Sequence, residues 1–162
     1  ELAQDTFIFS GTILENIRYG NLSATEEEII NASKAVRAHE FIINLKDGYN
    51  TQVNERGSRL SVGQRQLISF ARALLADPKI LILDESTSAL DKKAYNLESS
   101  LLSINDLTLI VVTHKLIKNI LLNYDEIIVM KDGMVIEKGS FDYLISLKGY
   151  FYSLYYLQNE YI

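Results

Sequence analysis

The sequence predicts an α/β fold in which a largely helical part precedes a parallel sheet. The apolar run Ile80–Leu83 follows Pro78 and ends in two carboxylates, Asp84 and Glu85. This is the pattern of a buried parallel strand with acids at its carboxyl end. A helical pattern and a second apolar run, over 107–112, come next, and this succession predicts a right-handed crossover between parallel neighbours.

The composition suits one compact globular domain. The chain has 162 residues, of which 48% are hydrophobic, with 8 Gly and 1 Pro, so a sizeable core is expected rather than disorder. The net charge of -5 and the lack of a basic block argue against a dedicated nucleic-acid binder. The sequence has no cysteine, hence no disulfide framework. Since no apolar run approaches the roughly 18 residues of a membrane span, any membrane connection is expected through another segment or chain.

The first 77 residues contain two capping boxes, in which a Ser or Thr is followed three residues later by Glu or Gln. Thr25 and Glu28 predict a helix from about Glu26 to Ala38. Ser61 and Gln64 predict a long helix that stops at Asp77-Pro78. The shorter elements expected here are a helix over Thr12–Arg18, a helix over 39–48 and a polar loop over 51–59 that pivots at Gly57.

The start of the long helix is a candidate phosphate site. A helix N-terminus presents unpaired amides and a positive partial charge, and Gly63 in the first turn lets an anion approach the backbone. Without its context, Leu60–Gln64 more often indicates a plain capped helix that has an incidental glycine.

The strand ends carry the other candidate residues. Asp84 and Glu85 are consecutive in an extended chain, so they point to opposite sides, and one can hold a metal while the other faces a water. The second strand ends in Thr113-His114, and parallel neighbours about 5 Å apart bring the imidazole to the same edge. Ligands of α/β folds bind at this edge. The alternative is a set of unrelated polar residues in solvated turns.

The remaining elements follow from local signals. Asp91 is expected to cap a helix that reaches about Leu102, after a turn over 86–90. Ile127–Met130 and Met134–Glu137 predict a hairpin, since a glycine-containing turn separates them. Ser140 is expected to cap a further helix. The aromatic stretch 150–156 is expected to form a terminal helix that packs on its own sheet, with a partner surface as the alternative.

Taken together, these stretches resemble the nucleotide-binding domain of ABC transporters, of the exporter type, from the glutamine loop to the C-terminus. The resemblance covers essentially the whole chain, and its motifs occur in the family's order. They are the glutamine loop Gln4–Ile13, the exporter segment Thr51–Gly57, the signature motif Leu60–Gln64, Walker B at Ile80–Glu85, the D-loop Ser88–Asp91 and the switch histidine His114. The resemblance implies a P-loop NTPase-like parallel sheet core, of which the chain holds the later part, and a helical subdomain.

The reaction that this resemblance implies is Mg²⁺-dependent ATP hydrolysis coupled to export. Asp84 and Gln4 would hold Mg²⁺, and Glu85 would accept the proton of the attacking water. His114 would hydrogen-bond the γ-phosphate and steady that water. Glu85 and His114 are thus the expected catalytic residues.

The resemblance also implies partners. Ser61, Gly63, Gln64 and Asp91 would bind nucleotide, with Ser61 and Gly63 on the γ-phosphate held by an opposing subunit. A second nucleotide-binding domain is therefore expected, in a homodimer or a heterodimer, together with a transmembrane domain fused upstream and no nucleic acid. The parent protein would work at the cytoplasmic face of the membrane.

Two departures from the family pattern matter. Val62 stands where the signature usually has glycine, and a β-branched residue there would hold the helix end further from phosphate and weaken one site of a heterodimer. The intact Glu85 argues against a dead site. No Gly-x-x-x-x-Gly-Lys-Ser/Thr occurs, so the main phosphate cradle is missing. We therefore expect one ATPase domain truncated at its start, with a helical part over 1–77 and a core part over 78–162, inactive by itself.

Two other readings remain open. A soluble ABC-type ATPase acting on ribosomes or DNA is the first, although the acidic balance and the exporter-like segments 6–13 and 51–57 weigh against it. The second is a short, non-catalytic interaction module that docks its Ser61–Gln64 helix onto a complete partner.

Overall fold

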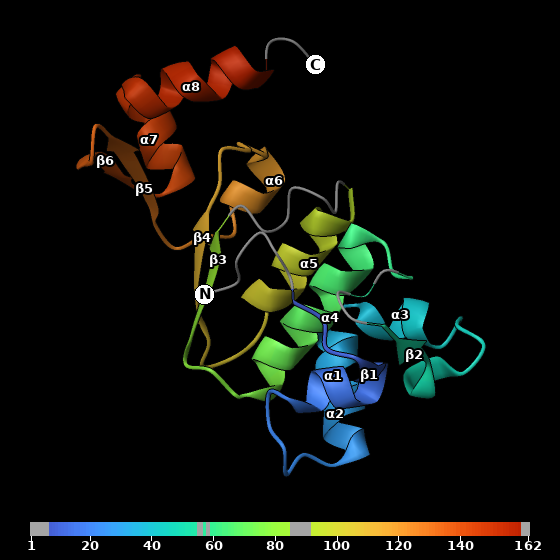
Figure 1. Cartoon of the computed structure of the whole chain (residues 1–162). Coiled ribbons are helices and arrows are strands. Elements are labelled where there is room, and N and C mark those ends of the chain that lie inside the picture. The colour runs from blue at the N-terminus through green and yellow to red at the C-terminus, as the bar shows by residue number, and fades with distance from the viewer. Residues whose placement is uncertain (1–6, 55–56, 58, 85–91, 160–162) are drawn as a thin grey trace. The chain divides into compact units, whose positions relative to one another are not determined.

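The computed structural model describes residues 7–54, 57, 59–84 and 92–159. Contacts within the chain divide it into two units, Glu1–Val112 and Thr113–Ile162, and each is described by itself (Figure 1). The sequence predicts a division of the domain into parts over 1–77 and 78–162. That division groups motifs, and it stays a prediction.

The first unit contains helices and short strands that alternate along the chain. In order they are β1 (Gly11–Thr12), α1 (Ile13–Arg18), α2 (Glu26–Ala35), α3 (Ala38–Ile42), the 3-10 turn η1 (Gly48–Asn50), β2 (Gln52–Val53), α4 (Val62–Leu75), β3 (Ile80–Asp84), α5 (Lys92–Leu102) and β4 (Thr108–Val112).

Three helices of this unit begin with complete capping boxes. Thr25 caps α2 with Glu28, and Ser61 caps α4 with Gln64, as the sequence predicts. Thr12 caps α1 in the same way. Each box satisfies two amides that helix geometry would leave without a partner, so the starts of these helices are fixed by local chemistry.

The predicted helix over 26–38 is shorter than expected. It ends at Ala35, and α3 begins at Ala38 because Arg37 has a left-handed backbone with φ of 59°. Such a residue terminates a helix. The predicted helix over 39–48 is also too long, since α3 ends at Ile42.

The predicted loop over 51–59 contains a short strand. β2 pairs antiparallel with β1, with Gly11 opposite Val53, and Val53 is buried. A strand of two residues has no periodic pattern, which is why the sequence did not indicate it.

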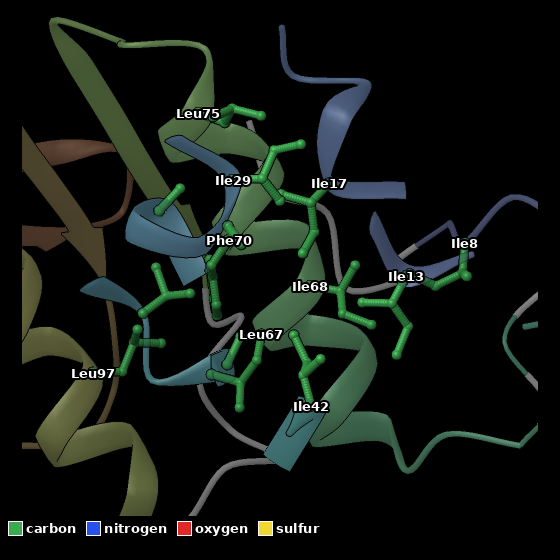
Figure 2. Packing of buried hydrophobic residues seen from close by; sticks show 14 of the residues in the cluster. Ile8, Ile13, Ile17, Ile29, Ile42, Leu67, Ile68, Phe70, Leu75 and Leu97 are labelled. Atoms are coloured by element: carbon green, nitrogen blue, oxygen red, sulfur yellow. The ribbon is translucent and has the colours of Figure 1, made fainter. Parts of the chain in front are cut away.

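α4 is the centre of the apolar core. It contacts α1, α2 and α3, and six consecutive residues, 66–71, are buried. Figure 2 shows apolar side chains from the surrounding elements gathered around it, among them Ile13, Ile29 and Ile42. Full burial of one such side chain contributes about 1.5–3 kcal/mol, so this packing holds α4 in place.

β3 and β4 form the parallel pair that the sequence predicts. Their register runs from Ile80 opposite Thr108 to Asp84 opposite Val112. α5 lies between them in sequence, which makes the unit a strand–helix–strand crossover (Figure 1). The carboxyl ends of both strands therefore lie at one edge.

The expectation that the first strand is buried on both faces is wrong for the described residues. Leu81 and Leu83 are buried in one cluster with Leu97 of α5, whereas Ile80 is 59% exposed and Ile82 is 37% exposed. The alternation arises because successive side chains point to opposite faces, and only one face of this two-stranded sheet packs on the core.

The second unit consists of a hairpin and three helices. They are α6 (Lys118–Leu121), β5 (Ile127–Lys131), β6 (Met134–Gly139), α7 (Phe141–Leu147) and α8 (Tyr150–Asn159). The hairpin is confirmed, and its turn has positive φ at both Asp132 and Gly133, as a two-residue type I′ turn requires. Ser140 caps α7 as predicted.

A carboxylate ties the hairpin to α8. Glu137 of β6 accepts the amides of Tyr150 and Phe151 at 2.6 and 2.8 Å. Phe151 is buried, and Tyr155 packs beside it against Phe141. Within the described residues, no helix of either unit combines the length and the hydropathy needed to cross a membrane.

Candidate functional site

The N-terminus of α4 presents unpaired amides. Ser61 Oγ accepts the Gln64 amide at 3.2 Å, and Gln64 Oε1 accepts the Ser61 amide at 2.9 Å. The amides of Val62 and Gly63 have no partner within the helix. Because Ser61 Oγ only accepts in this pair, its hydroxyl hydrogen remains available for an oxygen outside the helix.

The turn before α4 fixes the direction of this helix end. Gly57 has φ of 61°, its amide donates to Asn54 O, and its carbonyl accepts the Leu60 amide, both at 2.8 Å. Arg65 Nη1 donates to Leu60 O at 2.7 Å. A Cβ on Gly57 would lie 3.0 Å from Arg65 Cδ and 3.3 Å from Ile8 Cβ. The predicted pivot at Gly57 is thus confirmed.

The charge at this helix end differs from that of its neighbours. α2 has three acids in its first turn, and α1 has Glu15, whereas α4 has none. Acidic side chains in a first turn neutralise the positive end of the helix dipole. Their absence leaves the dipole and the amides of α4 able to attract an anion.

Asp84 supplies an oxygen ligand at the carboxyl end of β3. Its side chain is exposed, and the structure records no hydrogen bond or ion pair from it to another described residue. A carboxylate in this state suits Mg²⁺, which prefers oxygen ligands. The other predicted metal ligand, Gln4, lies outside the described residues.

Glu85 and Asp91 also lie outside the part of the chain that the structure describes, so their predicted roles stay predictions. Over residues 7–54, 57, 59–84 and 92–159, no three His, Asp or Glu side chains come together as a metal site would require. Asp84 is the only predicted metal ligand among these residues.

His114 belongs to the second unit. It follows the last residue of β4 by two positions, and its side chain is exposed. Its carbonyl oxygen accepts Gln158 Nε2 at 2.9 Å, and Gln158 Oε1 accepts the Leu116 amide at 2.6 Å. These bonds hold the His114 backbone to α8. The predicted approach of the imidazole to Asp84 stays a prediction.

Two polar residues outside the predicted site, Asn16 and Arg72, form a network in the first unit. Asn16 is fully buried and bonds to the backbone of Phe9 and Thr12. Arg72 of α4 donates to Asn16 and to the carbonyl of Phe7. The available signal was a lone Asn between the buried Ile13 and Ile17 of a short helix.

Comparison with known proteins identifies the fold. The family model for ABC transporters matches residues 2–88. The chain also superposes on a bacterial Atm1-family ABC exporter with ATP bound, with a TM-score of 0.88 and 34% identity, over 98% of this chain and 28% of that one. The predicted α/β class, with a parallel core pair and a helical part, is confirmed.

The chain is also similar to curated proteins of Bacillus subtilis. It is 50% identical over 153 residues to the ABC transporter ATP-binding protein YknV, and this alignment covers 93% of the chain and 25% of YknV. It is 48% identical over 158 residues to YgaD, whose name describes a multidrug export ATP-binding/permease protein, over 96% of this chain and 27% of YgaD. The chain thus spans about a quarter of the length of these relatives. Since the family model covers more than half of its residues, the chain belongs to the ABC transporter family.

Proposed function

We propose that this chain is part of an exporter ATPase domain that binds ATP with Mg²⁺, hydrolyses it and thereby drives export across a membrane. The observation that carries the proposal is the pairing, within one unit, of an acid-free helix start at Ser61 with a parallel strand that ends in Asp84. The first suits a phosphate and the second suits a metal. The similarity to an exporter with ATP bound supports the same function.

The metal-binding role falls to acidic and amide oxygens. Asp84 would hold Mg²⁺ together with Gln4. Mg²⁺ would neutralise the negative charge that develops on the transferred phosphoryl group. Glu85, the residue after Asp84 in the sequence, would face the attacking water and accept its proton.

The phosphate-binding role falls to α4. The amides of Val62 and Gly63 and the hydroxyl of Ser61 are donors, and the helix dipole adds a positive potential. Gln64 keeps Ser61 in place through the capping box. The exposed Val62 side chain stands at the same helix end, and we expect it to restrict how closely a phosphate approaches. His114 and Asp91 would complete the contacts to nucleotide.

The site as proposed needs other protein segments. This chain has no Gly-x-x-x-x-Gly-Lys-Ser/Thr sequence, so the amides and lysine that cradle phosphates must come from elsewhere. α4 would face a nucleotide held by a second nucleotide-binding domain. A transmembrane domain would supply the export path and place this domain at the cytoplasmic face.

Replacing Glu85 in the full-length protein tests the reaction. Glu85→Gln should keep ATP binding and lower the hydrolysis rate by about 100-fold or more, because an amide cannot accept the proton. Equilibrium binding of ATP and initial rates of phosphate release would be measured on the same preparation. Glu27→Gln, in the exposed first turn of α2, is the matched control. Unchanged hydrolysis by Glu85→Gln would remove Glu85 from the role of base.

A further inference from the structure

Arg72, near the end of α4, binds a segment that is more than fifty residues away in sequence. Its Nε donates to Asn16 O at 2.8 Å, its Nη2 to Asn16 Oδ1 at 3.1 Å and its Nη1 to Phe7 O at 3.0 Å. The guanidinium carbon also lies 5.3 Å from the centroid of the Phe9 ring, within cation–π range. Four contacts thus join one side chain to the stretch 7–16.

Asn16 adds hydrogen bonds to the backbone that precedes α1. Its Nδ2 donates to Phe9 O and to Thr12 O, and its Oδ1 accepts the Phe9 amide, all at 2.9 Å. With the bond from Arg72, both donors and both acceptor positions of the fully buried amide are used. Asn16 therefore fixes the path of residues 9–12.

The apolar core does not fix this path. Ile8 is buried, but Phe7 and Phe9 on either side of it are 52% and 37% exposed. Apolar packing is non-directional, whereas the planar fork of an arginine defines both distance and direction. The Arg72 side chain is partly buried, and this burial lowers its pKa from the usual value. A polar clamp in this place specifies geometry more than it adds stability.

The backbone of Gly20, just after the C-terminal end of α1, also lies very close to the backbone of α4. A Cβ added to Gly20 would collide with the carbonyl oxygen of Arg72. The segment 7–20 is therefore seated on the end of α4 by the Arg72 side chain and by a position where only glycine fits.

We propose that Arg72 and Asn16 form a clamp that positions residues 7–16, the described stretch that follows Gln4 in the sequence, relative to α4, so that Arg72 is a positioning residue for the ATPase reaction. The inference rests on the proposed function. α4 has 14 residues, and at 1.5 Å per residue it is about 21 Å long. One rigid helix thus presents Ser61 at its start and holds the stretch that follows Gln4 near its end. Through α4, the predicted contact of Ser61 with the nucleotide of a second domain and the stretch that follows the predicted Mg²⁺ ligand Gln4 keep a fixed relation.

Arg72→Lys in the full-length protein tests this clamp, because lysine keeps the charge but loses the fork. We expect kcat to fall by about tenfold or more, since small misplacements near a reacting centre have large effects on rate. KM for ATP should stay within about twofold, because residue 72 does not touch nucleotide. The matched control is Arg37→Lys, an exposed arginine whose side chain does not cap α3.

The hydrogen-exchange rate of the Phe9 amide tests the clamp independently of ATPase activity. Its exchange should be faster in Arg72→Lys and unchanged in Arg37→Lys, with similar melting temperatures for both. If Arg72→Lys does not fold, Phe9→Leu removes the ring beneath the guanidinium, together with its contacts to Phe7 and Tyr19, and should lower kcat by about two- to fivefold.

The outcomes separate this inference from the proposed function. A protein that hydrolyses ATP with the same kcat per folded molecule in Arg72→Lys, or in Phe9→Leu where that variant is used, would overturn the clamp alone. Absence of Mg²⁺-dependent hydrolysis in the unsubstituted protein would overturn both.

Discussion

The helical region around α4 and the β3–β4 pair belong to the same unit, but they differ in how completely their apolar side chains are buried. Residues 66–71 of α4 are all buried, whereas β3 is buried only at alternate positions and Ile110 and Val112 of β4 are exposed. Parallel sheets are normally covered on both faces. Within the described residues, the helix that begins at Ser61 is thus packed into the core, whereas one face of the strand pair that carries Asp84 is exposed. Substitutions in the two regions should therefore differ in size.

The largest effect is expected in the centre of α4. Phe70→Ala should lower the free energy of unfolding by about 3–5 kcal/mol, because Phe70 is almost fully buried and the change leaves a cavity. Urea unfolding of the chain, followed by circular dichroism, measures this. Leu22→Ala, at a side chain that is 75% exposed, is the control and should stay within about 0.5 kcal/mol. A loss below about 1 kcal/mol for Phe70→Ala would contradict the conclusion that α4 is the centre of the core.

The two faces of β3 should respond unequally. Leu83→Ala should lower the free energy of unfolding by about 2–5 kcal/mol, since Leu83 lies in the core. Ile82→Ala, one residue earlier on the open face, should lower it by about 1 kcal/mol or less. Equal losses in urea unfolding would mean that the open face is covered in solution.

The capping residues separate stability from function. Ser61→Ala and Thr25→Ala should each lower the free energy of unfolding by about 1 kcal/mol, since both remove the same kind of capping bond. In the full-length protein only Ser61→Ala should also slow ATP hydrolysis, because α2 has no proposed contact with nucleotide. If both variants slowed hydrolysis equally, the effect would be one of folding, and the proposed phosphate contact of Ser61 would be contradicted.

The smallest effect is a pH dependence of the helical region. Hydrogen bonds from the backbone and side chain of Thr25 hold the pKa of Glu28 below its usual value of 4.5. The stabilisation by this carboxylate is present above that value and is lost as the pH falls through the lower, folded pKa. Unfolding midpoints at neutral pH and below pH 4.5 should therefore differ less in Glu28→Gln than in the unsubstituted chain. Identical differences would exclude this contribution.

Local signals predicted much of the fold. The boxes at Thr25 and Ser61, the hairpin turn at Asp132-Gly133 and the parallel pair of β3 and β4 are each determined by residues close in sequence or by simple connectivity. The break between α2 and α3 escaped prediction because Arg37 is not a residue type that favours a left-handed backbone.

Long-range contacts explain what the sequence did not reveal. The pairing of β1 with β2 and the bonds of Arg72 to Asn16 join residues about forty and 56 positions apart, and no local pattern indicates them. For the site, the sequence predicted Ser61, Gly63 and Asp84 at the ends of their elements, which the structure confirms as positions. Their chemical roles, and those of Gln4, Glu85, Asp91 and His114, remain predictions.

The most direct test of the central claim is the rate of phosphate release from ATP by the full-length protein as a function of Mg²⁺ concentration. Asp84→Asn should raise the Mg²⁺ concentration for half-maximal rate by about tenfold or more, because it weakens a metal ligand. Asp106→Asn is the control, since Asp106 precedes β4 at the opposite end of the strands and has a positive φ that Asn tolerates. It should leave that concentration unchanged. The same Mg²⁺ dependence in all three proteins, or hydrolysis without Mg²⁺, would contradict the account.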